Sequence, residues 1–188
     1  MKLLEEHVGD SYVAGVFDGP RPYWVCGFCG NCAPPDPPWW KQKASEILGP
    51  RVRELSLYQV GQKEIEPLAR LTSLQDLNLT NSQITNLRPL SRLGELQHIG
   101  LNHTQVGDLA PLASLTNLRA IYLYETPVVN LAPLANLKQL TTITAGHSQI
   151  DDLTPVAGLA GLVSLHVEHT QVRDLTPLSR LPLLTTLS

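Results

Sequence analysis

A 22-residue repeat is the feature that most restricts how this chain can fold. From Leu71 onward the sequence aligns on itself at that interval, and its apolar residues recur in columns. The four main columns are Leu74, Leu96, Leu118, Leu140 and Leu162; Leu77, Ile99, Ile121, Ile143 and Leu165; Leu79, Leu101, Leu123, Ala145 and Val167; and Ile84, Val106, Val128, Ile150 and Val172. Because one such unit is too short to bury its own apolar side, the units must stack and share a core.

Two parts of each repeat predict its local structure. The Leu-x-Leu pair alternates with period two, which indicates a short strand with one buried side. The following Asn/Asp-Leu-x-Pro-Leu segment predicts a capped helical turn, because the Asn or Asp oxygen can accept a backbone N–H and the proline needs no donor there. The capping column is Asn86, Asp108, Asn130, Asp152 and Asp174. The first repeat is looser, since Gln62 stands where Ile84 stands in the next.

These columns resemble the leucine-rich-repeat superfamily, and within it the bacterial 22-residue repeats of internalins. The resemblance covers about residues 50–188, roughly six repeats and a partial seventh. It implies an α/β fold: a right-handed solenoid with a parallel β-sheet on its concave side and short 3-10 or helical turns on its convex side. One column departs from the family, which usually has a buried asparagine where this chain has Ser82, Thr104, Thr126, Ser148 and Thr170. A hydroxyl offers fewer hydrogen bonds than an amide, so a continuous asparagine ladder is not expected.

The resemblance also implies a non-enzymatic protein–protein interaction module that binds a partner through the concave face. Tyrosine and histidine on a rigid strand surface suit this role, because they bury area at a small entropic cost. The residues expected to bind the partner are Tyr58, His98, Asn102, His103, Tyr122, Tyr124, Glu125, His147, His166 and Glu168. Two alternatives are that these positions are only solvated, or that the row formed by His103, Glu125, His147 and His169 shares a metal ion.

Residues 1–49 differ in composition and predict a separate N-terminal segment. Residues 17–38 are rich in glycine and proline, which favours extended backbone without regular pairing. From Trp39 to Leu48, apolar residues at 40, 44, 47 and 48 fall on one helical face, and Gly49-Pro50 is a stop signal. We expect a cap helix here that covers the first repeat, since the ends of a solenoid must be covered.

Three cysteines in this segment are the strongest indication of metal chemistry. Cys26, Cys29 and Cys32 have the spacing of a zinc knuckle, with His7 or Asp36 as a fourth ligand. An iron–sulfur cluster is a weaker alternative, because Asp36 stands where a further cysteine is expected. Free or packed thiols are the favoured interpretation, so no cofactor is expected and zinc is the alternative.

Composition and charge narrow the class of partner. The formal net charge is −3 and there is no Lys/Arg block, so nucleic acid is not an expected partner. No run of 18 apolar residues predicts a membrane span. Two acidic residues directly after Leu3-Leu4 argue against a signal peptide, and an odd number of cysteines argues against a disulfide framework. A cytoplasmic protein is therefore expected, and the resemblance to the internalin repeats implies a bacterial one.

The sequence leaves other functions open. A bacterial immunity protein that neutralises an effector is one alternative, and a spacer between domains is another. A thiol-dependent enzyme would need Cys26 beside a concave histidine, but neither a Gly-rich phosphate loop nor a nucleophile elbow accompanies it.

The last repeat predicts an exposed end. Leu187 aligns with Leu165, so the sequence stops within a seventh strand without a polar cap. The expected apolar end surface consists of Leu175, Leu178, Leu181 and Leu184. Such a surface predicts self-association, unless a longer protein or a partner covers it.

Overall fold

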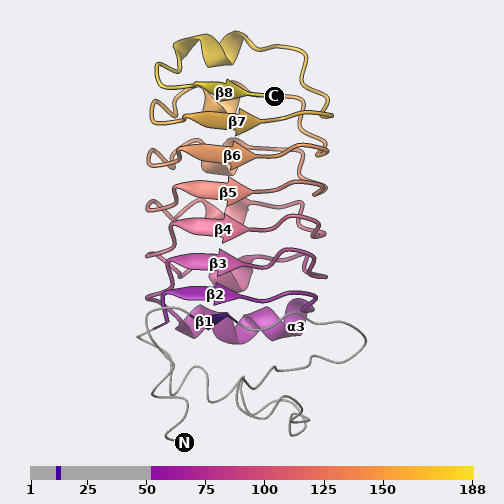
Figure 1. Cartoon of the computed structure of the whole chain (residues 1–188), viewed down its shortest axis with the longest axis vertical. Coiled ribbons are helices and arrows are strands. Elements are labelled where there is room, and N and C mark those ends of the chain that lie inside the picture. The colour runs from indigo at the N-terminus through magenta and orange to yellow at the C-terminus, as the bar shows by residue number, and fades with distance from the viewer. Residues whose placement is uncertain (1–11, 14–51) are drawn as a thin grey trace, which may run out of the picture.

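The structure is a computed structural model that describes residues 12–13 and 52–188. The predicted cap helix and the three cysteines lie outside the described residues. One parallel sheet runs the length of the stack with its strands in chain order (Figure 1). The strands are β1 (Tyr12–Val13), β2 (Glu54–Ser56), β3 (Asp76–Asn78), β4 (His98–Gly100), β5 (Ala120–Tyr122), β6 (Thr142–Thr144), β7 (Ser164–His166) and β8 (Thr186–Leu187).

The strand register confirms the repeat. Leu55 lies opposite Leu77 and Leu165 lies opposite Leu187, each pair one repeat apart. The predicted partial seventh strand of the solenoid is therefore present as β8. At the other end, Tyr12 pairs with Leu55, so β2 has a neighbouring strand on both sides.

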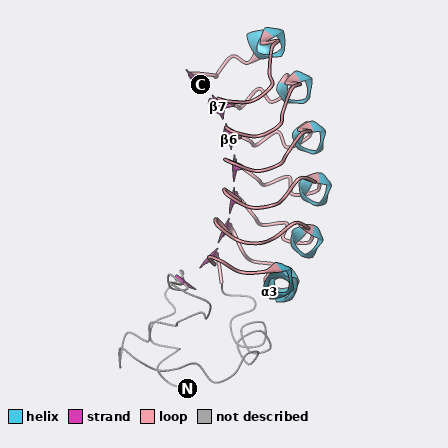
Figure 2. Cartoon of the chain, turned by 90° about the vertical axis from the view of Figure 1, so that its right-hand side faces the viewer, coloured by secondary structure: helices cyan, strands magenta, loops and turns pink. Residues whose placement is uncertain are grey.

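Short helical turns form the opposite side of the stack, as the proline column predicts (Figure 2). They are α3 (Gln62–Ile65), η2 (Glu66–Arg70), η3 (Arg88–Leu90), η4 (Ala110–Leu112), η5 (Ala132–Leu134), η6 (Thr154–Val156) and η7 (Thr176–Arg180). In each of the five regular repeats, the Asn or Asp Oδ1 accepts the backbone N–H two residues on, at 2.7–3.0 Å. The predicted cap is confirmed. No helix among the described residues is long and apolar enough to cross a membrane.

In the first repeat, the polar side chain of Gln62 stands at the position of the Ile84 column and contacts the second repeat. Gln62 Oε1 accepts the backbone N–H groups of Thr85 and Asn86 at 3.1 and 2.9 Å, and its Nε2 donates to the Asn86 carbonyl at 2.8 Å. The residue that departs from the Ile84 column thus joins the first repeat to the second through backbone hydrogen bonds.

The apolar columns form one continuous core. From Leu74 to Leu165 nearly all their side chains are inaccessible to solvent. The hydroxyl column lies beside them, and Thr104, Thr126, Ser148 and Thr170 each donate to the carbonyl three residues earlier at 2.6–2.7 Å. These bonds lie within one repeat and do not form a ladder between repeats. Among the described residues, no buried side-chain nitrogen or oxygen lacks a partner.

The C-terminal end corrects one expectation. Leu178 and Leu181 are buried, because η7 stacks on η6 and both side chains join the common core. Leu175, Leu183 and Leu187 are exposed, and Leu184 is only partly buried. The apolar end surface therefore exists, but Leu178 and Leu181 do not belong to it.

The acidic members of the capping column predict how stability depends on pH. The pKa of Asp152 lies below the ordinary value of 3.8 because the Thr154 side chain, and to a smaller extent the Thr154 backbone, hydrogen-bonds with the carboxylate. Thr176 lowers the pKa of Asp174 in the same way. Because the folded pKa is the lower one, this stabilisation is complete above the unfolded pKa and is lost as the pH falls through the folded value. We expect the free energy of unfolding to decrease below about pH 4.

Urea denaturation between pH 7 and pH 3 measures this dependence. The matched variant is Asp152→Asn with Asp174→Asn, since Asn86 and Asn130 cap the same turn in other repeats. The double variant should lose less stability between pH 5 and pH 3 than the native chain. Identical pH profiles would show that these two carboxylates contribute nothing to the acid sensitivity.

Candidate binding face

The strands lie on the side of the solenoid opposite the helical turns (Figure 2). Four columns of residues cover this sheet side, and together they are named here the concave face. The first column is Glu54, Asp76, His98, Ala120, Thr142 and Ser164; the second is Ser56, Asn78, Gly100, Tyr122, Thr144 and His166; the third is Tyr58, Thr80, Asn102, Tyr124, Gly146 and Glu168; the fourth is Gln59, Asn81, His103, Glu125, His147 and His169. The positions between the first three columns are buried core columns, so strand alternation fixes which of these residues face outward. The fourth column directly follows the third.

The fourth column has a left-handed backbone in every repeat. Its six residues have φ between 52° and 60°, and none of them is glycine. This conformation is rare for residues with a Cβ, and asparagine and histidine accept it more readily than most. The turned N–H groups of His103 and His147 donate to the carbonyls of Tyr124 and Glu168, each at 2.8 Å. The left-handed backbone is thus common to all six repeats, while the side chain at this position differs between repeats and determines which groups the concave face exposes.

Rings from four successive repeats contact one another along this edge. The centroids of His103 and Tyr124 are 5.6 Å apart, and those of Tyr124 and His147 are 5.1 Å apart, both edge to face. His147 and His169 follow at 4.3 Å with tilted planes. Glu125 joins the same row, since its Oε2 lies 3.0 Å from His103 Nδ1. We name these five residues the ring row.

The ring row does not have the arrangement of a metal site. Its imidazoles contact neighbouring rings and do not converge with Glu125 on one point. Within the part of the chain that the structure describes, no group of three or more His, Cys, Asp or Glu side chains could hold a metal ion. The shared-metal alternative for this row therefore gains no support from its geometry.

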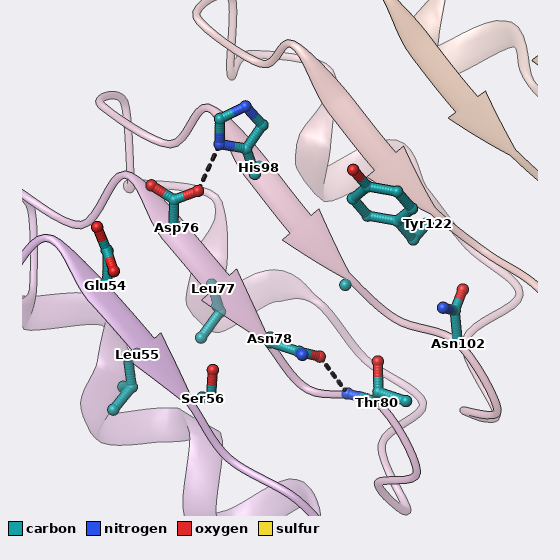
Figure 3. Close-up of a pocket in the computed structure, with 11 residues that line it drawn as sticks. Glu54, Leu55, Ser56, Asp76, Leu77, Asn78, Thr80, His98, Asn102 and Tyr122 are labelled. Carbon is teal, nitrogen blue, oxygen red and sulfur yellow. Dashed lines mark hydrogen bonds and ion pairs between the residues drawn. The ribbon is translucent and has the colours of Figure 1, made fainter. Parts of the chain in front are cut away.

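A second group of predicted residues lines a depression in the N-terminal half of the face (Figure 3). Its volume is about 310 Å³, and β2, β3, β4 and β5 all contribute to it. Three predicted residues meet here, namely His98, Asn102 and Tyr122. His98 Nδ1 hydrogen-bonds with Asp76 Oδ1, and Asn102 Oδ1 accepts the Tyr124 N–H at 2.9 Å.

The depression also contains residues that were not predicted. Glu54, Asp76, Asn78 and Gly100 contribute to its wall or floor. A Cβ on Gly100 would lie 2.7 Å from Asn78 Oδ1, so this glycine creates the space. The available signal was one glycine in a column of larger residues, with the two acids Glu54 and Asp76 in the first column of the two preceding repeats.

The other predicted residues lie apart from these two groups. The Tyr58 hydroxyl accepts a hydrogen bond from Asn78 Nδ2 at 3.1 Å beside the depression. At the far end, His166 Nδ1 lies 2.7 Å from the Ser188 hydroxyl, which also donates to Glu168 Oε2 at 3.1 Å. The predicted site is therefore a face with three local groups of residues and not one converging constellation.

The face has an uneven charge. Its four columns contain four acidic residues, Glu54, Asp76, Glu125 and Glu168, but no lysine or arginine. The basic residues of the repeats lie elsewhere, for example at Arg92, Arg119 and Lys138. With histidines counted as neutral, the concave face is therefore negatively charged.

Comparison with known proteins agrees with the repeat architecture. The sequence matches no protein-family model and no curated protein. Among solved structures, the chain is similar to an internalin C2 from Listeria monocytogenes, with 30% identity and a TM-score of 0.72, over 77% of this chain and 66% of that one. It is also similar to a leucine-rich-repeat protein from Leptospira interrogans, with 24% identity and a TM-score of 0.65, over 73% of this chain and 37% of that one. The chain thus spans just under two thirds of the first protein and less of the second.

Proposed function

We propose that this chain, which belongs to the leucine-rich-repeat superfamily, is a non-enzymatic protein–protein interaction module whose concave face binds the partner. The ring row is the observation that carries the proposal. Contacts between adjacent repeats hold Tyr124 between His103 and His147, with centroid distances of 5.6 and 5.1 Å. Side chains that are already ordered lose little entropy when a partner buries them.

The cysteines bear on the cellular compartment in which the module acts. Three cysteines within seven residues do not have the sequence pattern of a disulfide framework, which favours a reducing compartment, and we propose a bacterial cytoplasmic protein. An immunity protein that covers the active surface of an effector is one specific form of this function. A zinc-binding adaptor or a thiol-dependent enzyme would depend on Cys26, Cys29 or Cys32, which lie outside the described residues.

Capture of a partner by matched variants tests the proposed face. Thr144 is the last residue of β6 and lies between Tyr122 in β5 and His166 in β7, so Thr144→Arg places a bulky cation in the middle of the concave face. Gln139→Arg adds the same side chain at an exposed position before the strand. The native chain and Gln139→Arg should capture the same stoichiometric partner from native lysate, and Thr144→Arg should not.

Both variants must first give the far-ultraviolet circular dichroism spectrum and urea midpoint of the native chain. Equal capture by the two arginine variants would move the interface away from the concave face. Thiol-dependent turnover without any captured partner would instead favour the enzyme.

We also propose self-association through the C-terminal end. Leu183 is 55% exposed there and Leu187 is 45% exposed, beside β8, which pairs only with β7 among the residues that the structure describes. An edge strand next to apolar side chains favours pairing with another chain. Sedimentation velocity over a concentration series should show association of the native chain, and Leu183→Asp should shift the chain to monomer.

Val129→Asp is the matched control, because Val129 is 49% exposed but lies in the middle of the stack. This variant should associate as the native chain does. A native chain that stays monomeric at every concentration, like Leu183→Asp, would contradict self-association.

A further inference from the structure

We propose that the depression around Gly100 is a binding site for the side chain of an arginine presented by the partner. This inference rests on the proposed function and adds the chemistry that one part of the face recognises. It depends on the shape of the depression, its charge, and the position of one exposed aromatic ring.

The shape fits a side chain and not a flat protein surface. Gly100 leaves its position in the second column empty, between Asn78 in β3 and Tyr122 in β5 (Figure 3). The volume of about 310 Å³ exceeds what one or two water molecules occupy. Asn78 is held at the edge, since its Oδ1 accepts the Thr80 N–H at 3.0 Å and its Nδ2 donates to the Tyr58 hydroxyl. The cavity wall is therefore ordered before a ligand enters.

The charge of the lining selects a cation. Glu54 and Asp76 both line the depression, and no lysine or arginine lines it. Asp76 Oδ1 hydrogen-bonds with His98, which orients the carboxylate and leaves Oδ2 for a ligand. No other hydrogen bond or ion pair to either carboxylate is present among residues 52–188. An anionic ligand such as a phosphate would meet repulsion here, whereas a cation would complete an ion pair.

Tyr122 distinguishes a guanidinium group from a simple ammonium ion. Its side chain is 36% exposed and lines the depression on the side away from the two carboxylates. A planar guanidinium can stack on an aromatic ring while its N–H groups donate to a carboxylate, and an ammonium group cannot do both with the same geometry. The Asn102 amide and the Thr80 hydroxyl line the same space and can bond the remaining donors.

Titration of the full chain with a small probe tests this site without the partner. The probe is N-acetyl-L-arginine N-methylamide, and its citrulline analogue has nearly the same shape without the charge. Two-dimensional 15N–1H NMR should give saturable shifts centred on the Gly100 amide with the arginine probe. The affinity of the citrulline probe should be about tenfold lower, since a charged hydrogen bond to a carboxylate is replaced by a neutral one.

Variants distinguish recognition by the carboxylates of the depression from the general electrostatic attraction of the negatively charged concave face. Asp76→Asn should lower the affinity for the arginine probe about fivefold to tenfold. Glu125→Gln removes the same charge from the same face but outside the depression, and it should change the affinity less than about twofold. Gly100→Val fills the space at the cost of moving the Asn78 amide, and it should abolish the saturable shifts.

Several results would overturn the inference. Equal binding of the two probes would indicate neutral polar recognition. Equal effects of Asp76→Asn and Glu125→Gln on the affinity would show that the depression does not recognise the charge locally. NMR shifts that persist in Gly100→Val, or that never appear in the native chain, would also contradict the site. The proposed function is tested separately, because Thr144 does not line the depression. A failed titration with normal partner capture would reject the arginine site alone.

Discussion

Leu140→Ala is expected to lower the free energy of unfolding by about 3 kcal/mol, within the range of about 2–5 kcal/mol for a buried leucine. The Leu140 side chain is inaccessible to solvent and belongs to the column directly before the strands. The cavity left by alanine cannot close easily, because hydrogen bonds fix the repeats on both sides. The Thr141 N–H donates to the Arg119 carbonyl, and the Val163 N–H donates to the Thr141 carbonyl, each at 2.8 Å.

Urea denaturation monitored by circular dichroism measures this change. Val129→Ala is the control, since it removes apolar atoms from a valine that is 49% exposed, and it should change the free energy of unfolding by less than about 0.5 kcal/mol. A loss below about 1 kcal/mol for Leu140→Ala would contradict a tightly packed core shared between repeats. A reduced m-value would show that the repeats no longer unfold as one unit.

Tyr124→Ala is expected to weaken binding of the captured partner by about 1–3 kcal/mol, a factor of roughly 5 to 150 in Kd. Tyr124 is the central member of the ring row and contacts His103 and His147 in the adjacent repeats. Alanine removes the ring from the interface and also the edge-to-face contacts that order both imidazoles. The core should be unaffected, because Leu123 and Ala145 remain buried beneath this position.

Isothermal titration calorimetry with the purified partner provides the measurement. Tyr124→Phe is the matched control, because it keeps both ring contacts and removes only the hydroxyl, and its affinity should stay within about fivefold of the native value. Unchanged affinity of Tyr124→Ala would show that the partner binds elsewhere. The Trp39-Trp40 segment, which lies outside the described residues, would then be the first region to examine.

The sequence alone determined the repeat, the strand register and the core. An apolar period of 22 residues leaves one way to stack the units, and strands such as β3 and β4 pair with the register it predicts. The capping column was also predictable, because the hydrogen bond that the Ala110 N–H donates to Asp108 Oδ1 joins residues two apart in the chain. Which residues face outward followed from strand alternation in the same way.

The tertiary structure decided how the outward residues meet. The ring contacts of Tyr124 depend on side-chain rotamers and on the left-handed backbone of the neighbouring column. Neither can be read from the aligned repeat sequences. The same holds for the space above Gly100, which depends on where the Asn78 and Tyr122 side chains lie. Burial of Leu178 and Leu181 follows from the path of η7. Periodicity specifies which residues are neighbours, but contacts between side chains from different repeats are set only when the packed stack selects their conformations.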